Sequence, residues 1–485
     1  MKILQVSAEI YPLLKTGGLA DITGALPAAL RAAGCDPRVL LPGFAVMLAD
    51  LQGAETIAKL TAPWGEPFTV VRGRLAALNT VAYVIDAPAL YLRPGSNPYE
   101  DAQRQPYADN HRRFALLGYA AARLAQGLDA QWQPEVVHCH DWHAALAPAY
   151  MALLPVSESA RVATVYTVHN LAYQGLFPAR YFDDLGLPDT AFATDGMEYY
   201  GQLSFMKAGL YYADRISTVS PTYAREIQTP EQGCGLDGLL RARADCLCGI
   251  LNAVDDAVWN PAHDAHIPFA YDANKSAGKG RCKAALQKEL GLTVLKDAPL
   301  FGVVSRLTEQ KGLHLVLAAL DALLARGGQL VVLGSGEGWM EDAFRERAAA
   351  HADALAVRIG YDERFAHRIF AASDVTLVPS RFEPCGLTQM YGLKYGSLPL
   401  VRRVGGLADT VVDCTLEDLA EGNATGFVFD EFSVAGFERA LRRAFALYGR
   451  RTEWSAVRAR GLRQDLGWQN AAAQYVALYR AALAA

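Results

Sequence analysis

Short apolar runs alternate with longer amphipathic segments along most of the chain. In the first half, buried strands are predicted at Lys2–Ala8, Arg38–Leu41, residues 136–137, Arg161–Val168, Arg215–Val219 and Gly249–Val254. In the second half, they are predicted at Leu300–Val304, Leu330–Leu333, Ala356–Ile359, Val375–Val378, Leu398–Val401 and Gly426–Phe429. Helical periodicity fills most of the intervals, for example at Asn110–Gln126 and Trp468–Leu483. This alternation predicts an α/β fold with doubly wound parallel sheets, and the β-forming stretch Phe68–Tyr91 adds hairpins.

The βα pattern starts twice, which predicts two domains. A chain of 485 residues is also longer than one hydrophobic core usually supports. The polar, proline-containing stretch at 255–266 separates the two halves. We predict a first domain over residues 1–250, a linker over 251–265, a second domain over 266–465, and a C-terminal helix over 466–485 that packs back toward the first domain.

Composition narrows the class of protein. A hydrophobic content of 52% and a charged content of 20% are typical of a soluble globular protein. The net charge of −5 argues against nucleic-acid and membrane partners. The eight cysteines lack CxxC spacing, and the first residues lack the apolar core of a signal peptide, so we expect reduced thiols and a cytoplasmic protein.

The loop at 380–386 is the strongest candidate site in the second half. It follows the predicted strand Val375–Val378 and opens a helix predicted from about Leu387 to Tyr395. Ligands of open α/β sheets bind at such strand ends, and free helix N–H groups favour anions. Glu383 lies just before these donors. It is either a helix-capping acid or a group that contacts sugar hydroxyls or a developing positive charge.

Other polar residues follow neighbouring strands of the same predicted sheet. Arg306 and Lys311 lie in the loop after Leu300–Val304, and Tyr361 follows Ala356–Ile359. The carboxyl ends of parallel strands share one edge, so these groups are expected to converge. Two cations would hold a diphosphate, and a tyrosine at the rim would stack on a base. The alternative is that the two cations are solvated surface charges.

The first half carries a glycine-rich loop after its first strand. Lys15 precedes Gly17 and Gly18 in a strand–loop–helix arrangement that suits a phosphate, although it is neither a Walker A loop nor GxGxxG. A flexible loop with a solvated lysine is the alternative. Further on, Tyr99 lies in the polar stretch 95–109, which is a candidate lid or ligand loop.

The stretch HCHDWHAAL at 138–146 allows two interpretations. His138, His140, Asp141 and His143 are possible metal ligands, but neighbours on a strand point to opposite faces. We therefore favour a strand end that presents Asp141 to a ligand. His169, with Asn170, ends the predicted strand Arg161–Val168 in the same way.

Five motifs together resemble the bacterial glycogen synthases and plant starch synthases. They are KTGGLAD at 15–21, HDWH at 140–143, VHN at 168–170, SRLTEQKG at 305–312 and SRFEPCGLTQMYGLKYG at 380–396. The resemblance implies the GT-B fold, with two Rossmann-like domains facing across a deep cleft. It also implies transfer of glucose from ADP-glucose to the non-reducing-end 4-hydroxyl of an α-1,4-glucan such as glycogen, with retention of configuration, release of ADP and no cofactor or metal.

The resemblance also assigns roles to individual residues. The catalytic residues it implies are Glu383, Arg306, Lys311, His169 and Asp141. The donor-binding residues are Lys15, Gly17, Gly18, Asn252, Tyr361, Cys385, Gly386, Leu387 and Thr388. On the acceptor side and its loop, the residues are Tyr99 and Asp21. Two positions depart from the pattern: Tyr391 replaces a second glutamate found in the wider superfamily, and Ala253 replaces a glycine.

Two alternative functions stay open at this point. A non-catalytic glucan-binding or regulatory protein would bind glycogen without releasing ADP. A GT-B enzyme that uses UDP-glucose would share the fold and most of the site, since the choice of base rests on the resemblance. The intact set of Lys15, Arg306, Lys311 and Glu383 argues for an enzyme.

Overall fold

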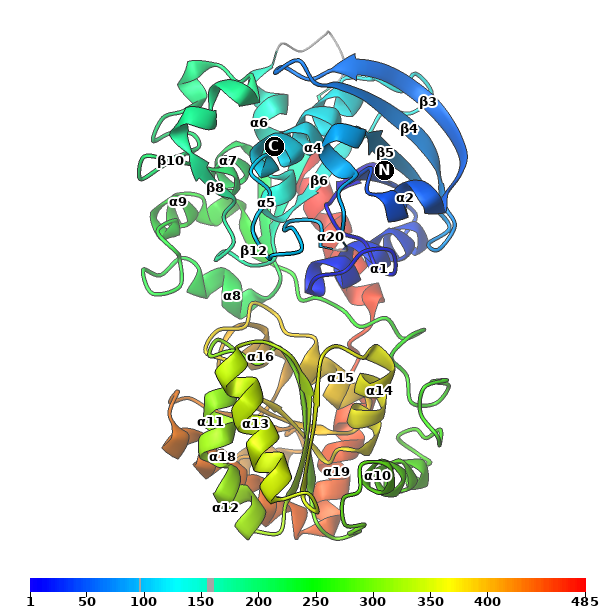
Figure 1. Cartoon of the computed structure of the whole chain (residues 1–485), viewed down its shortest axis with the longest axis vertical. Helices are drawn as coiled ribbons and strands as arrows, with labels where there is room; N and C mark the ends of the chain where they lie inside the picture. Colours follow the sequence, from blue (N-terminus) through cyan, green and yellow to red (C-terminus); the bar gives the residue numbers. More distant parts are fainter. Residues whose placement is uncertain (96, 155–160) are drawn as a thin grey trace. The chain divides into compact units, whose positions relative to one another are not determined.

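The computed structural model describes residues 1–95, 97–154 and 161–485. The chain divides into two compact units (Figure 1). Unit 1 comprises Met1–Asn252 with Trp468–Ala485, and unit 2 comprises Ala253–Gly467. Residue 96, in the predicted ligand loop at 95–109, lies outside the described residues. The described helices include none that is long and apolar enough to cross a membrane.

Unit 1 is built on a nine-stranded sheet. Its strands, in chain order, are β1 (Lys2–Val6), β2 (Asp36–Pro42), β3 (Leu51–Thr61), β4 (Pro67–Leu75), β5 (Thr80–Asp86), β6 (Val136–His140), β7 (Ala163–Val168), β11 (Arg215–Thr218) and β12 (Leu247–Gly249). Their spatial order is β12-β11-β7-β6-β1-β2-β5-β4-β3. β4 pairs antiparallel with β3 and β5, which confirms the predicted hairpin, and the other pairings are parallel.

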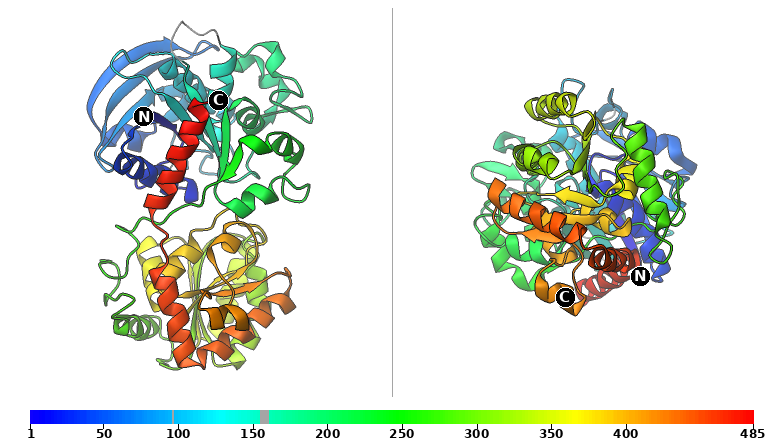
Figure 2. Two further views of the ribbon diagram at one scale, coloured as in Figure 1. Left: turned by 180° about the vertical axis from the view of Figure 1, so that it is seen from behind. Right: turned by 90° about the horizontal axis from the view of Figure 1, so that it is seen from below.

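Helices and a small second sheet complete unit 1. The helices are α1 (Gly18–Ala32), α2 (Ala45–Asp50), α3 (Pro88–Tyr91), α4 (Asn110–Ala125), α5 (Asp141–Ala144), α6 (Leu146–Leu153), α7 (Phe205–Tyr212), α8 (Pro221–Glu226), α9 (Asp237–Ala242) and α20 (Trp468–Leu483). The small sheet contains β8 (Leu176–Pro178), β9 (Glu198–Tyr199) and β10 (Gln202–Ser204). Figure 2 shows α20, in red, running along unit 1. Its Tyr475 and Tyr479 are buried in one cluster with Ile3 and Val165, which anchors the chain's last helix to the first sheet.

Unit 2 is a six-stranded parallel sheet with helices on both faces (Figure 1). Its strands are β13 (Leu300–Val304), β14 (Gln329–Gly334), β15 (Leu355–Ile359), β16 (Val375–Val378), β17 (Leu398–Arg402) and β18 (Phe427–Phe429). Its helices are α10 (Ala277–Glu289), α11 (Leu313–Ala318), α12 (Leu320–Ala325), α13 (Gly338–Ala350), α14 (Glu363–Ala372), α15 (Thr388–Lys394), α16 (Gly405–Thr410), α17 (Leu416–Glu421), α18 (Val434–Tyr448) and α19 (Arg451–Arg463). All six strands were predicted: five are short apolar runs that are almost wholly buried, and the edge strand β15 is a short, mostly apolar run that is only partly buried.

Two predictions from sequence differ from the structure. The strand predicted at Gly249–Val254 is wrong: β12 ends at Gly249, and residues 250–254 are mostly buried without forming a strand. Most of the linker predicted over 251–265 lies within unit 2, which begins at Ala253. Trp259 stacks on His367 and on Tyr391, with ring centroids 3.7 and 3.9 Å apart. Tyr391, which replaces the superfamily's second glutamate, therefore helps to anchor this segment.

Among its parallel strands, each sheet has a switch point, at which crossovers leave in opposite directions. In unit 1 it lies between β1 and β6, and in unit 2 it lies between β13 and β16. Ligands of open α/β sheets bind outside the carboxyl ends of the strands at such switch points. The loops that carry most of the candidate residues follow these four strands.

Candidate active site

Glu383 and Lys311 meet at the switch point of unit 2. The Lys311 ammonium donates to Glu383 Oε2 at 2.6 Å, and the Ser380 hydroxyl donates to the same oxygen at 2.8 Å. The Glu383 side chain is 8% exposed and the Lys311 side chain 19%. The predicted convergence of these two residues from the loops after β13 and β16 is confirmed.

Close backbone packing fixes the loop that carries Glu383. The Gly406 amide donates to the Glu383 carbonyl at 3.2 Å, and a Cβ on Gly405 would lie 1.9 Å from that carbonyl oxygen. Gly386 has a φ of 73°, a left-handed conformation that favours glycine. The loop therefore depends on glycines at positions where a side chain would collide or be strained.

Gln389 orients the peptide groups at the start of α15. Its Nε2 donates to the carbonyls of Cys385 at 3.0 Å and Gly386 at 2.7 Å. In a trans peptide the next N–H points the opposite way, so the amides of Gly386 and Leu387 face away from Gln389. Thr388 begins α15. Sequence reasoning missed Gln389, because its partners depend on the loop's folded shape.

Arg306 and Tyr361 lie at the exposed rim of the same edge. The Arg306 guanidinium donates to Gln310 Oε1 at 3.1 Å. Tyr361 is 69% exposed, and its hydroxyl donates to Glu363 at 2.6 Å. The Arg381 amide donates to the Gln310 carbonyl at 2.8 Å, which ties the loop after β13 to the loop after β16.

Glu9 organises the switch point of unit 1, and sequence reasoning missed it. Its side chain accepts hydrogen bonds from the Thr16 amide and the Thr16 hydroxyl, each at 2.6 Å. It also accepts from the Tyr99 hydroxyl at 2.5 Å. Glu9 is 2% exposed. It therefore joins the glycine-rich loop to the loop that carries Tyr99. These segments are far apart in the sequence, so a local sequence pattern could not predict the contact.

The glycine-rich loop places its charged residues near the start of α1. The Lys15 ammonium contacts Asp21 Oδ1 at 2.7 Å. Gly17 is the N-cap residue of α1, and Gly18 is its first helical residue. A Cβ on Gly17 would meet no heavy atom of the described residues within 4 Å. Packing in the free protein therefore does not require a glycine here. The open space beside Gly17 leaves room for a ligand against the backbone.

Asp141 and His169, each the first residue after its strand, β6 or β7, are held together by a hydrogen bond. Asp141 Oδ1 accepts from the His169 amide at 2.7 Å. Asp141 has a φ of 56°, uncommon for a residue other than glycine. Burial, with a contribution from Glu9, raises the pKa of Asp141 to about 7. Burial lowers the pKa of His169 to about 3, so its imidazole is neutral.

Of the three histidines around Asp141, His138 and His140 hydrogen-bond to protein groups and His143 stacks on an aromatic ring. His138 Nδ1 lies 2.9 Å from the Tyr479 hydroxyl, and its Nε2 lies 2.6 Å from the Thr167 hydroxyl. His140 Nδ1 lies 3.0 Å from His169 Nε2. The ring of His143 stacks on Tyr99 at 4.6 Å. Across residues 1–95, 97–154 and 161–485, no group of three or more His, Cys, Asp or Glu side chains is placed to hold a metal ion.

Asn252, the last residue of unit 1, carries a buried polar atom. Its Oδ1 has no hydrogen-bond partner among the residues that the structure describes. The residue as a whole is 8% exposed. A buried acceptor of this kind is costly unless a ligand or water bonds to it, which is compatible with its predicted donor-binding role.

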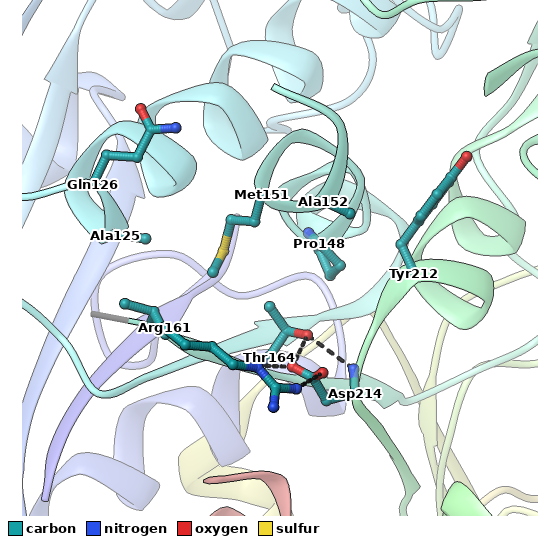
Figure 3. Close-up of a pocket in the computed structure, with 10 residues that line it drawn as sticks. Ala125, Gln126, Pro148, Met151, Ala152, Arg161, Thr164, Tyr212 and Asp214 are labelled. Atoms are coloured by element: carbon teal, nitrogen blue, oxygen red, sulfur yellow. Dashed lines mark hydrogen bonds and ion pairs between the residues drawn. The ribbon is translucent and has the colours of Figure 1, made fainter. Parts of the chain in front are cut away.

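A cavity of about 350 Å³ in unit 1 lies at the other edge of the sheet (Figure 3). Thr164, near the start of β7, and Asp214, just before β11, form part of its wall. Asp214 accepts from Arg161 at 2.6 Å and from the Thr164 amide at 2.7 Å. The candidate site residues follow carboxyl ends of strands, so this cavity is separate from them.

Family models and solved structures show to which class of protein the chain belongs. Residues 2–242 match the family model described as starch synthase catalytic domain, and residues 291–457 match glycosyl transferases group 1. The structure is similar to the catalytic domain of Starch Synthase IV from Arabidopsis thaliana bound to ADP and acarbose, with a TM-score of 0.90, 30% identity, and coverage of 100% of this chain and 99% of that one. A sucrose-phosphate synthase from Thermosynechococcus elongatus shares the fold at a TM-score of 0.57 and 16% identity, covering 99% and 98% of the two chains. The protein is a glycosyltransferase with the GT-B fold.

Full-length relatives define the family. A glycogen synthase from Variovorax paradoxus is 66% identical over 100% of this chain and 99% of its own length. A glycogen synthase from Leptothrix cholodnii is 60% identical over 99% of each chain. The chain belongs to the glycogen synthase family, which confirms the resemblance found in its motifs.

Proposed function

We propose that the protein transfers glucose from ADP-glucose to the 4-hydroxyl at the non-reducing end of an α-1,4-glucan, with retention of configuration and release of ADP. The observation that carries this proposal is the Lys311–Glu383 pair at the switch point of unit 2. It places a cation and a buried carboxylate beside the amides that begin α15. A diphosphate and a sugar need these two kinds of partner side by side.

Lys311 and Arg306 would stabilise the departing diphosphate. The bond between the anomeric carbon of the glucose and the diphosphate oxygen breaks in this reaction. Negative charge then grows on the leaving diphosphate, and fixed cations stabilise that charge. In the free protein Lys311 is neutralised by Glu383. A bound diphosphate would offer Lys311 a second anion, while the amides of Gly386 and Leu387 add donors. We assign Cys385 and Thr388 to the same donor-binding segment.

Glu383 would bind glucose hydroxyls and stabilise an oxocarbenium-like transition state. Retention through a covalent intermediate requires a carboxylate nucleophile. Asp141 is a poor candidate, because it accepts a backbone hydrogen bond and burial holds its pKa at about 7. We therefore propose a front-face route, in which the leaving phosphate takes the acceptor's proton and the acceptor attacks from the same face.

Unit 1 would contribute to both substrates. Lys15 and the amides of Gly17 and Gly18 are assigned to the donor's phosphates, with support from the open space beside Gly17. His169 is assigned to the sugar near the reacting carbon, where a neutral imidazole avoids repulsion of developing positive charge. Tyr99 is assigned to the acceptor side.

Asp21 and Asn252 complete the assignment. Asp21 is the partner of Lys15 on the acceptor side of the loop, and Asn252 offers its unpartnered Oδ1 to the donor. This scheme uses no metal ion and no organic cofactor. The protein's partners would be ADP-glucose and glycogen, without nucleic acid or membrane. We place it in the cytoplasm, since all eight cysteines are free thiols.

Nucleotide release tests this function against the alternatives. Purified protein is incubated with ADP-glucose or UDP-glucose, each with and without glycogen, and free nucleotide is measured. We expect ADP release that depends on glycogen and is far faster than UDP release. Comparable UDP release would overturn the assignment of the base. Binding of glycogen without release of either nucleotide would support a non-catalytic glucan-binding protein instead.

A further inference from the structure

The order of strands in unit 2 places one loop on the path of the nucleotide. β14 lies between β13 and β15. Lys311 follows β13, and Tyr361 follows β15. Adjacent strands are about 4.8 Å apart, so these two loops begin roughly 10 Å from each other along the sheet edge. A nucleotide with its diphosphate at Lys311 and its base at Tyr361 lays its ribose over the loop that follows β14.

Glu337 is the acidic residue of that loop. It is the N-cap residue of α13, yet within the described structure its side chain makes no capping bond to its own helix. Its Oε1 accepts instead from the Glu309 amide at 3.0 Å, and its Oε2 accepts from the Trp339 indole N–H at 2.8 Å. The Glu337 amide also donates to the Leu307 carbonyl at 2.9 Å. The carboxylate is thus turned toward the loop that carries Arg306 and Lys311.

This carboxylate remains able to accept further hydrogen bonds. The bonds from Glu309 and Trp339 lower the pKa of Glu337, so it is ionised at neutral pH. An ionised carboxylate offers about four acceptor positions, and the two bonds use one position on each oxygen. Glu337 is partly exposed at the sheet edge. Two adjacent hydroxyl groups are a suitable ligand for the positions that remain.

We propose that Glu337 binds the ribose hydroxyls of the donor nucleotide and that Trp339 is a positioning residue for its carboxylate. In dinucleotide-binding sheets that share this strand order, an acidic residue about 20 residues after the phosphate-binding loop bonds to a ribose hydroxyl. β14 is the second strand of this sheet, and Glu337 comes three residues after it. The inference rests on the proposed function, because it requires a nucleotide at this edge.

A purely structural role for Glu337 makes a different prediction. If it only ties the loops after β13 and β14 together, its removal weakens every nucleotide equally. If it bonds to the ribose, its removal weakens only nucleotides that carry ribose hydroxyls. The ratio of the affinity for a nucleotide with ribose hydroxyls to the affinity for one without them therefore separates the two roles. This holds even if the loop after β14 changes shape in the variant.

The experiment measures binding of ADP and of 2′,3′-dideoxy-ADP to the full chain by calorimetry. We expect wild-type protein to prefer ADP by about tenfold or more, since hydrogen bonds to a charged group are among the stronger ones. Glu337→Ala should bind dideoxy-ADP as wild type does and lose most of the preference for ADP. Trp339→Phe keeps an aromatic ring but removes the indole N–H, and it should reduce the preference about two- to fivefold.

Glu341→Ala is the matched control. Glu341 lies on the same helix, and its carboxylate accepts from the Gly336 amide of the same loop at 2.8 Å. The control should keep the full preference for ADP. An equal loss of both affinities in Glu337→Ala, or no preference in wild type, would overturn the inference. Failure of the wild type to bind either nucleotide would contradict the proposed function itself, and with it the inference.

Discussion

Replacement of Lys311 by methionine tests the centre of the site. The change keeps the aliphatic length and removes the charge that lies 2.6 Å from Glu383. If Lys311 stabilises the leaving diphosphate, kcat should fall by roughly 10²–10³, the usual effect of removing one preorganised donor at a centre of developing charge. The assay is glycogen-dependent release of ADP from ADP-glucose, measured at saturating concentrations of both substrates.

The same change should reduce stability. Removing one partner of a buried ion pair costs about 3–5 kcal/mol. Ser380 still donates to Glu383, and the Lys311 side chain is 19% exposed, so water replaces part of the interaction. We therefore expect a loss of about 2–3 kcal/mol, a reduction from the buried-pair cost. For a unit of this size, that loss lowers the Tm by roughly 4–12 °C.

A double variant separates catalysis from stability. Lys311→Met with Glu383→Gln removes both charges, so no uncompensated carboxylate is left. The Tm should return most of the way to the wild-type value, while kcat stays low. Full activity of Lys311→Met would refute the role of this lysine in catalysis. A double variant as unstable as the single one would refute the electrostatic explanation of the lost stability.

Three further predictions follow from other parts of the structure. Burial raises the pKa of Asp141 from its ordinary value of 3.8 to about 7, so its contribution to stability decreases as pH rises from about 4 to about 7; Asp141→Asn should flatten that part of the Tm–pH profile, and an unchanged profile would contradict the assignment. Trp259→Ala removes the ring stacked on His367 and Tyr391; it should destabilise unit 2 by about 3–5 kcal/mol and open residues 255–266 to proteolysis, whereas wild-type resistance would contradict the anchoring role. Dialysis against EDTA should leave kcat unchanged, and a loss restored by a divalent cation would contradict the metal-free scheme.

Sequence patterns predicted the parallel sheets well, because most of their strands are short buried apolar runs. β3 (Leu51–Thr61) was not predicted, since most of its residues are exposed and its pattern lacks clean alternation. The run Gly249–Val254 is mostly apolar, and much of it is buried. Burial alone does not make a strand, so the apolar pattern was misleading here. Trp259 shows the converse, since a polar, proline-containing stretch is fixed by one aromatic side chain that stacks on distant rings.

The candidate site was predictable where loops follow neighbouring strands. Parallel topology was enough to bring Lys311 to Glu383. The role of Glu9 was not predictable, because it depends on bonds to Thr16 and Tyr99 that form only when separate loops fold together. The left-handed backbone of Asp141 was likewise invisible in the pattern of residue types.

Carbon-13 NMR of the polymer product tests the central claim most directly. The protein is incubated with ADP-[1-¹³C]glucose and glycogen, and the anomeric signal of the transferred glucose is recorded. We predict a new α-1,4-linked anomeric carbon that appears only with glycogen and is absent for Glu383→Ala. A β-linked signal would contradict retention, and labelled free glucose or no transfer would contradict the assignment of the protein as a glucan-dependent glucosyltransferase.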